Sequence, residues 1–313
     1  MTWFQRLLLI TIAATFILVV IGGAVRATDS GLGCPDWPTC HGRLVPKLEK
    51  HTLIEYSHRT AATVVGFLFL GVTFCTFKGE RRHPREFWLA FTAGVLLLFQ
   101  IILGGIVVKK DLPPETVALH LGTAMTFIGV MIVTATLSLT RSRGMRALAR
   151  APESTYTRLA IAAAAAAFVT LLLGSYVSGT GASVACKSWP ACDSSLLGSG
   201  GDQGLHMLHR FAAGTLGVLL IALAWAAFDE RRGERALVAL PLVALGAYLA
   251  QALIGAANIW TDLSAGVVVT HLSLAALLWC LLVTVGALSW YLPGRAGDGR
   301  RATEAGKVAE WAR

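Results

Sequence analysis

Charged residues are scarce in this chain. Of its 313 residues, 14% are charged and 55% are hydrophobic, whereas an average soluble domain has roughly 25% charged residues. No polar stretch before residue 293 is long enough for a domain, because connectors of roughly 6 to 30 residues separate the apolar stretches. These shortages exclude an ordinary soluble globular protein and leave no room for a soluble domain. The composition therefore predicts an integral membrane protein.

The chain consists mainly of apolar stretches of about 20 residues, each long enough to cross a ~30 Å hydrocarbon layer as a helix. Eight such stretches lie near residues 7–25, 60–77, 87–108, 116–139, 159–177, 209–228, 237–259 and 266–290. The first could instead be a signal peptide, since Arg6 precedes it, but its apolar run is too long for a signal core. We predict an all-α protein with eight transmembrane helices in a lipid bilayer.

The net charge of +9 could indicate a nucleic-acid partner, but the basic residues follow the predicted membrane topology instead. Many of them lie in 78–85, 141–158, 231–235 and 295–313, which follow the second, fourth, sixth and eighth stretches. Because basic segments remain on the cytoplasmic side, we predict a multi-pass protein of the cell membrane with both termini inside. Nucleic acid is not an expected partner.

The second half of the sequence repeats the first. At an offset of 151 or 152 residues, matching pairs include Cys34 and Cys186, Trp37 and Trp189, Cys40 and Cys192, Gln100 and Gln251, and His120 and His271. A repeat of four helices with both ends on one side predicts two pseudo-symmetric four-helix bundles. We assign them to residues 1–150 and 151–292, followed by a polar cytoplasmic tail at 293–313.

Four histidines form two matched pairs. His58 and His209 begin the second and sixth apolar stretches, and His120 and His271 follow them by 62 residues. All four are predicted towards the outer face. Two imidazoles facing each other inside a bundle are typical axial ligands of haem iron, whereas zinc or copper would need further close ligands. A single histidine would more often be a packed polar residue, but the doubled pattern favours haem.

The residues beside these histidines have two interpretations each. Arg59 and Arg210 are either anchors at the membrane interface or partners of the haem propionates. Glu55 lies one helical turn before His58, where the second half has His206. Glu55 is either a helix N-terminal carboxylate or a group that moves protons during catalysis. In the second case the first half is catalytic and the second holds a cofactor, with His206 a supporting or surface residue.

Two outer connectors contain four of the six cysteines. Cys34 and Cys40, like Cys186 and Cys192, are separated by five residues, and on an oxidising face this predicts one local disulfide per loop. Zinc is the alternative, but the spacing exceeds the usual metal-binding spacing.

Other residues are assigned smaller roles. We expect packing roles for Cys75 and Cys280, solvated positions in connectors for His41, His51 and His83, close helix packing at Gly22, Gly23, Gly104, Gly105 and Gly255, and hydrogen bonds between helices from Gln100 and Gln251.

Over residues 1–292 these motifs together resemble the haem A synthase family. They are the cysteine loops, the pattern Glu-x-x-His-Arg, and the further histidines and His-Arg pair. The resemblance implies an oxidoreductase acting on a CH or CH2 group, which oxidises the C8 methyl of haem O through an alcohol, haem I, to the formyl group of haem A. It implies that His209 and His271 bind the iron of a resident haem b, that His58 and His120 bind the substrate haem, and that Glu55 is the acidic residue needed there.

The resemblance also implies partners: haem O synthase, assembly factors of cytochrome oxidase, and an electron acceptor outside the chain. Two rival functions are a quinone-linked, two-haem electron carrier like cytochrome b, and a haem transporter. Glu55 in one half only favours the enzyme. Extraction of the bound pigments separates these functions, because only the enzyme makes haem A.

Overall fold

The computed structural model describes residues 1–47, 49–79, 83–144, 154–193 and 195–290. Its long helices are α1 (Trp3–Ala27), α2 (Lys50–Lys78), α3 (Pro84–Lys109), α4 (Pro114–Ser142), α5 (Thr155–Thr180), α6 (Gly201–Glu230), α7 (Arg235–Trp260) and α8 (Ala265–Ser289). All eight are long and apolar enough to cross a membrane. The prediction of an eight-span, all-α membrane protein is confirmed. The predicted tail at 293–313 and the basic residues of 80–82 and 145–153 lie outside the described residues.

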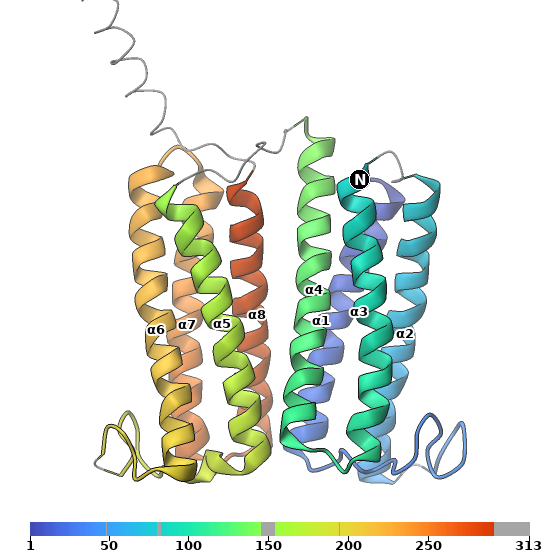
Figure 1. Ribbon diagram of the computed structural model, residues 1–313, viewed down its shortest axis with the longest axis vertical. Coiled ribbons are helices and arrows are strands. Elements are labelled where there is room, and N and C mark those ends of the chain that lie inside the picture. Colours follow the sequence, from blue (N-terminus) through green and yellow to red (C-terminus); the bar gives the residue numbers. More distant parts are fainter. Residues whose placement is uncertain (48, 80–82, 145–153, 194, 291–313) are drawn as a thin grey trace, which may run out of the picture.

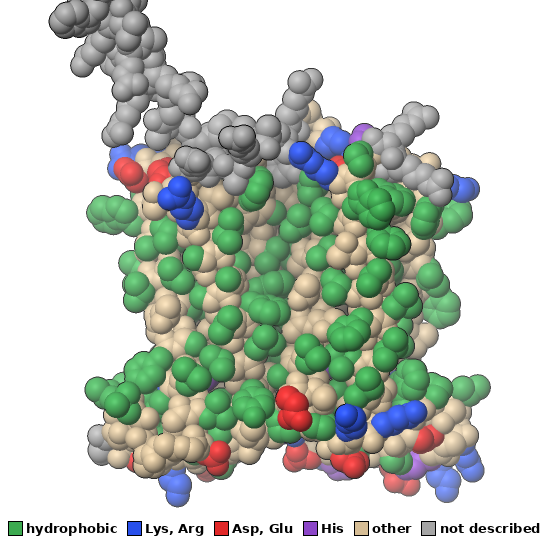
Figure 2. Space-filling view, viewed as in Figure 1, with side chains coloured by type: hydrophobic (Ala, Val, Ile, Leu, Met, Phe, Trp, Pro, Cys, Tyr) green, Lys and Arg blue, Asp and Glu red, His purple; other side chains and the backbone are tan. Residues whose placement is uncertain are grey.

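The helices form two groups with nearly parallel axes. Figure 1 shows α1 to α4 gathered on one side and α5 to α8 on the other, with both cysteine-containing loops at the end opposite the N-terminus. Figure 2 shows hydrophobic side chains over the middle of the visible face and charged side chains gathered near its two ends. An apolar belt between two charged ends is the surface that a bilayer requires.

The two groups pack against each other through small residues. A Cβ atom added to Gly23 of α1 would lie 2.7 Å from Leu272 of α8, and one added to Gly129 of α4 would lie 2.5 Å from Trp279. These distances are shorter than normal contacts, so the absence of a side chain lets the helices approach closely. The bundles therefore share a tightly packed seam formed by α1, α4, α5 and α8.

One sequence-based expectation is corrected. His51 was expected in a connector, but it lies in the first turn of α2, where its Nδ1 is 2.9 Å from Ser30 Oγ. The helix begins before the apolar stretch because Thr52 and Glu55 are buried on one of its faces. The His51 side chain is nonetheless exposed, as expected.

Candidate functional site

A single large cavity runs through both bundles. It measures about 1650 Å³ and is lined by residues of all eight helices, including His58, His120, His209 and His271. A pocket for one small ligand usually measures about 300–1,000 Å³, so this cavity has room for two large ligands. The structure thus brings the four predicted histidines to one apolar space, two from each bundle.

Each imidazole packs against a glycine of the preceding helix. A Cβ atom added to the glycine would lie 2.8–3.2 Å from the ring carbon Cε1, in the pairs Gly22 and His58, Gly104 and His120, Gly174 and His209, and Gly255 and His271. Any larger residue would push the ring away. The sequence indicated close packing at three of these glycines, and the structure shows that their neighbours are the histidines themselves.

Hydrogen bonds orient three of the rings. Nε2 of His120 lies 3.2 Å from Nε2 of Gln100, and Nε2 of His271 lies 3.4 Å from Nε2 of Gln251. Nδ1 of His209 lies 3.1 Å from the carbonyl oxygen of Thr170. The two glutamines do contact the next helix, and the groups they contact are the predicted ligands.

Haem fits the residues that surround this cavity. Nδ1 of His58, His120 and His271 is buried without a hydrogen-bond partner, and buried unpaired nitrogens call for an explanation such as a ligand. Among the described residues, no group of three or more His, Cys, Asp and Glu side chains gathers as an ion-binding cluster. A haem needs only axial ligands from the protein, because the porphyrin supplies the other nitrogens.

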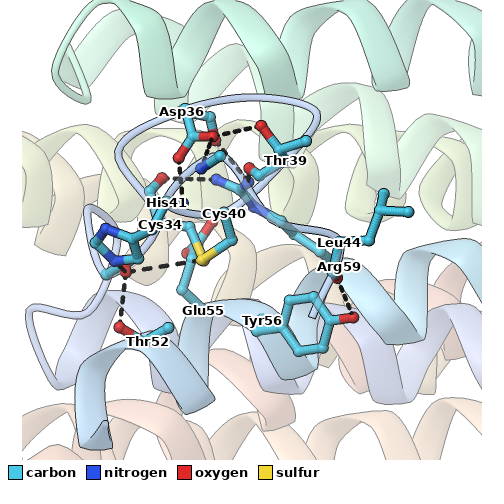
Figure 3. The surroundings of a disulfide bond; sticks show 12 residues. Cys34, Asp36, Thr39, Cys40, His41, Leu44, Thr52, Glu55, Tyr56 and Arg59 are labelled. Carbon is cyan, nitrogen blue, oxygen red and sulfur yellow. Dashed lines mark hydrogen bonds and ion pairs between the residues drawn. A yellow bond between two sulfur atoms is a disulfide. The ribbon is translucent and has the colours of Figure 1, made fainter. Parts of the chain in front are cut away.

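Arg59 connects the first cysteine loop to Glu55 (Figure 3). Its Nη1 donates to the carbonyl oxygens of Asp36 and Thr39, at 2.7 Å each, and its Nη2 donates to the carbonyl oxygen of Cys34 at 2.8 Å. Its Nε donates to Glu55 Oε1 at 3.1 Å. These four bonds leave one N–H on Nη2, so the main partner of this guanidinium within the protein is the loop. Binding of a propionate by Arg59 stays a prediction.

The second bundle repeats this arrangement. Nη1 of Arg210 donates to the carbonyl oxygens of Ser188 at 2.9 Å, Pro190 at 2.9 Å and Ala191 at 3.0 Å. Its Nη2 lies 3.4 Å from His206 Nε2. Both arginines therefore hold a loop over the cavity, and binding of a propionate by Arg210 also stays a prediction.

Glu55 and His206 mark a chemical difference between the two halves. Both line the cavity, both are almost completely buried, and each contacts the arginine four residues later. The sequence pattern is compatible with a surface position for His206, but the burial of its side chain excludes that position. The first half thus offers a carboxylate where the second offers an imidazole.

The cysteine loops cover the cavity. The structure contains the disulfides Cys34–Cys40 and Cys186–Cys192. Between the cysteines, Trp37 and Trp189 line the cavity, and Trp37 also packs against Gly105 of α3. In the sequence these tryptophans are visible only as repeat positions, and their place at the site was not predicted. Their recurrence in both loops was the available signal.

Asp36 organises the turn of the first loop. Its carboxylate accepts hydrogen bonds from the Thr39 hydroxyl and from the backbone N–H groups of Gly42 and His41. These hydrogen bonds lower the pKa of Asp36 to about 2, and the bond from Thr39 has the largest effect. The carboxylate therefore stays ionised at neutral pH, and its contribution to the turn is lost only as the pH falls from about 4 towards 2.

Removing the first disulfide should destabilise the protein moderately. In a Cys34→Ser, Cys40→Ser double variant we expect a loss of about 2 kcal/mol, because a short loop gains conformational freedom in the unfolded chain. The measurement is the thermal midpoint of the detergent-solubilised protein, with Cys75→Ala as the control for removing a free cysteine. An unchanged midpoint would show that the bonds of Arg59 suffice to hold the loop.

Adding one methyl group beside a histidine should disturb the site. In Gly174→Ala the new Cβ would lie 2.8 Å from Cε1 of His209, and we expect a destabilisation of about 1–3 kcal/mol from overpacking, with a changed absorption spectrum of any bound haem. Gly246→Ala on α7 is the control, since a Cβ there meets nothing within 4 Å and Gly246 does not line the cavity. Equal midpoints and spectra for the two variants would contradict the packing argument.

Comparison with known proteins identifies the family. The sequence matches the family model COX15-CtaA, described as cytochrome oxidase assembly protein, over residues 5–283 and 201–309. It is 30% identical to a heme A synthase of Shouchella clausii over 89% of this chain and 94% of that protein, and 28% identical to one of Shewanella oneidensis over 93% and 97%. A heme A synthase of Bacillus licheniformis is 30% identical over 90% and 92%. The chain therefore belongs to the COX15-CtaA family of cytochrome oxidase assembly proteins.

Proposed function

We propose that this protein is a haem A synthase, which oxidises the C8 methyl group of haem O to a formyl group. Relatives with that name align along almost the whole chain. The observation that carries the proposal is a two-bundle cavity with a histidine pair in each half and a carboxylate, Glu55, in the first half at the position of His206. A pure electron carrier would have no need of this difference.

The two halves receive different haems in this proposal. His209 and His271 of the C-terminal half, 151–292, hold a resident haem b, and His58 and His120 of the N-terminal half, 1–150, hold the substrate haem. The fit rests on the apolar cavity and on the unpaired nitrogens of buried imidazoles. The bound haem supplies the redox chemistry. The chain orients the macrocycle and, with its tryptophan-bearing loops, limits the access of water.

Glu55 acts as the proton-transfer group. Its Oε1 accepts a hydrogen bond from Arg59 Nε, which fixes the carboxylate towards the cavity without using both oxygens. Because Arg59 also binds three carbonyl oxygens of the loop, its guanidinium cannot rotate freely. A fixed carboxylate near the reacting methyl group can accept protons as that carbon is oxidised.

The orientation in the membrane follows from the charges. Lys78, Arg141, Arg143, Arg231 and Arg232 lie at the end opposite the cysteine loops. By the positive-inside rule, that end and both termini are cytoplasmic, and the histidines and loops lie towards the outer face. Haem O synthase and assembly factors of cytochrome oxidase are the partners expected to supply the substrate and receive the product.

Co-expression tests the function directly. The protein is produced with and without a haem O synthase in a host that makes no haem A, and the extracted pigments are separated by chromatography. We expect haem A, or its alcohol precursor, only when both proteins are present. Haem B alone, with haem O available, would contradict the synthase and favour an electron carrier.

A further inference from the structure

The cavity is not symmetric. In the first bundle it continues between α2 and α3, where its lining extends along α2 from Val65 to Phe77 and along α3 as far as Phe87. In the second bundle the lining of α6 ends at Leu216 and that of α7 at Tyr248. At the helical rise of 1.5 Å per residue, the groove of the first bundle is about 18 Å longer along α2.

Tyr248 closes the groove of the second bundle. Its hydroxyl donates a hydrogen bond of 3.0 Å to the carbonyl oxygen of Ala213. A Cβ atom added to Gly217 would lie 2.5 Å from that hydroxyl oxygen, so the ring rests on the bare backbone of α6. Beyond the ring, Leu220 and Leu237 are fully buried and fill the interior.

The first bundle has the same two small residues on its second helix but no tyrosine opposite them. At an offset of 151 residues, Ala213, Gly217 and Tyr248 correspond to Ala62, Gly66 and Leu97. A Cβ atom added to Gly66 would meet nothing within 4 Å, and Gly66 and Leu97 both line the open groove. The first groove therefore has a leucine where the second is closed by a tyrosine.

The open groove is apolar and reaches the surface of the bundle. Its lining includes Leu70, Phe91, Val95 and Leu98, all of which are exposed on the face that the bilayer covers. The only described polar side chains along its extension, those of Thr73 and Thr76, donate their hydroxyls to backbone carbonyls of their own helix. Such a groove suits a long hydrocarbon chain and offers nothing to a charged group.

We propose that the groove between α2 and α3 binds the isoprenoid tail of the substrate haem, and that Tyr248 excludes a tailed haem from the second bundle. The inference rests on the proposed function, since haem O and haem A carry a farnesyl chain that haem b lacks. The groove between α2 and α3 is continuous with the cavity at His58, so the macrocycle and its tail occupy one space. Steric exclusion thereby directs the prenylated haem to the half that contains Glu55.

A tyrosine placed in the first bundle tests the subsite. Leu97→Tyr should close the first groove as Tyr248 closes the second, because Ala62 and Gly66 match the two residues that Tyr248 contacts. Purified protein is titrated with haem B and with haem O, and binding is followed by absorption. We expect the affinity for haem O to fall about a hundredfold, because several tail carbons lose their burial, and the affinity for haem B to stay unchanged. Ile102→Tyr, on the lipid-exposed face of α3, is the matched control and should bind both haems normally.

Three outcomes decide the matter. Unchanged binding of haem O by Leu97→Tyr would overturn the proposal. An equal loss of affinity for both haems would also overturn it, since a tyrosine in the tail groove should not affect the binding of haem B, which has no tail. In the converse variant, Tyr248→Leu, we expect the affinity of the second bundle for haem O to rise, and an unchanged affinity would also count against the proposal. Failure of the wild-type protein to convert haem O would instead refute the proposed function, so the two failures are distinguishable.

Discussion

Replacing Glu55 by glutamine should stop the conversion of haem O to haem A and leave haem binding intact. Glutamine has nearly the same shape, and its carbonyl oxygen can still accept the hydrogen bond from Arg59 Nε. It cannot accept a proton at neutral pH. Loss of a positioned acid or base typically costs about 10²–10⁴-fold in rate, so haem A should be almost absent from cells that co-express a haem O synthase.

The matching position of the other bundle provides the control. His206→Gln changes the residue that contacts Arg210, outside the proposed oxidation site, and should preserve most of the conversion. Pigment extraction from both variants gives the ratio of haem A to haem O, and absorption spectra give the total haem. Near-normal haem A production by Glu55→Gln would remove the proton-transfer role and leave Glu55 as a partner of Arg59.

The second large effect concerns the resident haem. We expect His209→Ala or His271→Ala to deplete haem b from the purified protein, because either change removes an axial ligand from a buried site. Loss of an outer partner of a metal ligand already costs about 10–100-fold in affinity, and loss of the ligand itself should cost at least as much. The measurement is the haem content per chain, from the Soret absorption and the extracted pigment.

Two comparisons test whether the loss of haem b is specific to His209 and His271. His51→Ala, which changes an exposed histidine of α2, should retain the full haem content. His58→Ala or His120→Ala should spare haem b and weaken the binding of haem O. A normal haem b spectrum in both His209→Ala and His271→Ala would refute the assignment of the resident haem to the second bundle.

Two of the differences between the bundles have separate consequences for the site. Glu55 opposite His206 is a difference in proton chemistry, and Leu97 opposite Tyr248 is a difference in available space. Both favour the first bundle as the place where a tailed haem is bound and oxidised. Both bundles have arginine bonds to a loop and a glycine packed against each histidine, because any haem needs a covered cavity and fixed ligands.

The eight helices and the repeat follow from the amino-acid sequence alone, which also predicts the four histidines that line the cavity. Apolar stretches long enough to span a bilayer have few other structures available, because backbone groups within lipid must be hydrogen-bonded internally. The repeat could be read directly, since Cys34, Trp37 and His120 each recur at an offset of 151 or 152 residues. The local disulfides also followed from the sequence, because each pair lies within one short loop.

The groups that meet across helices are known only from the folded arrangement. The contact of Gly174 with His209 and the bonds of Arg59 to the loop join residues 20 to 35 positions apart, and helix rotation sets whether they face each other. The closure by Tyr248 was equally hidden, because a tyrosine in an apolar stretch can point to lipid or to the interior. Its direction depends on the bare backbone at Gly217 and on the carbonyl oxygen of Ala213, which the folded bundle brings next to the ring.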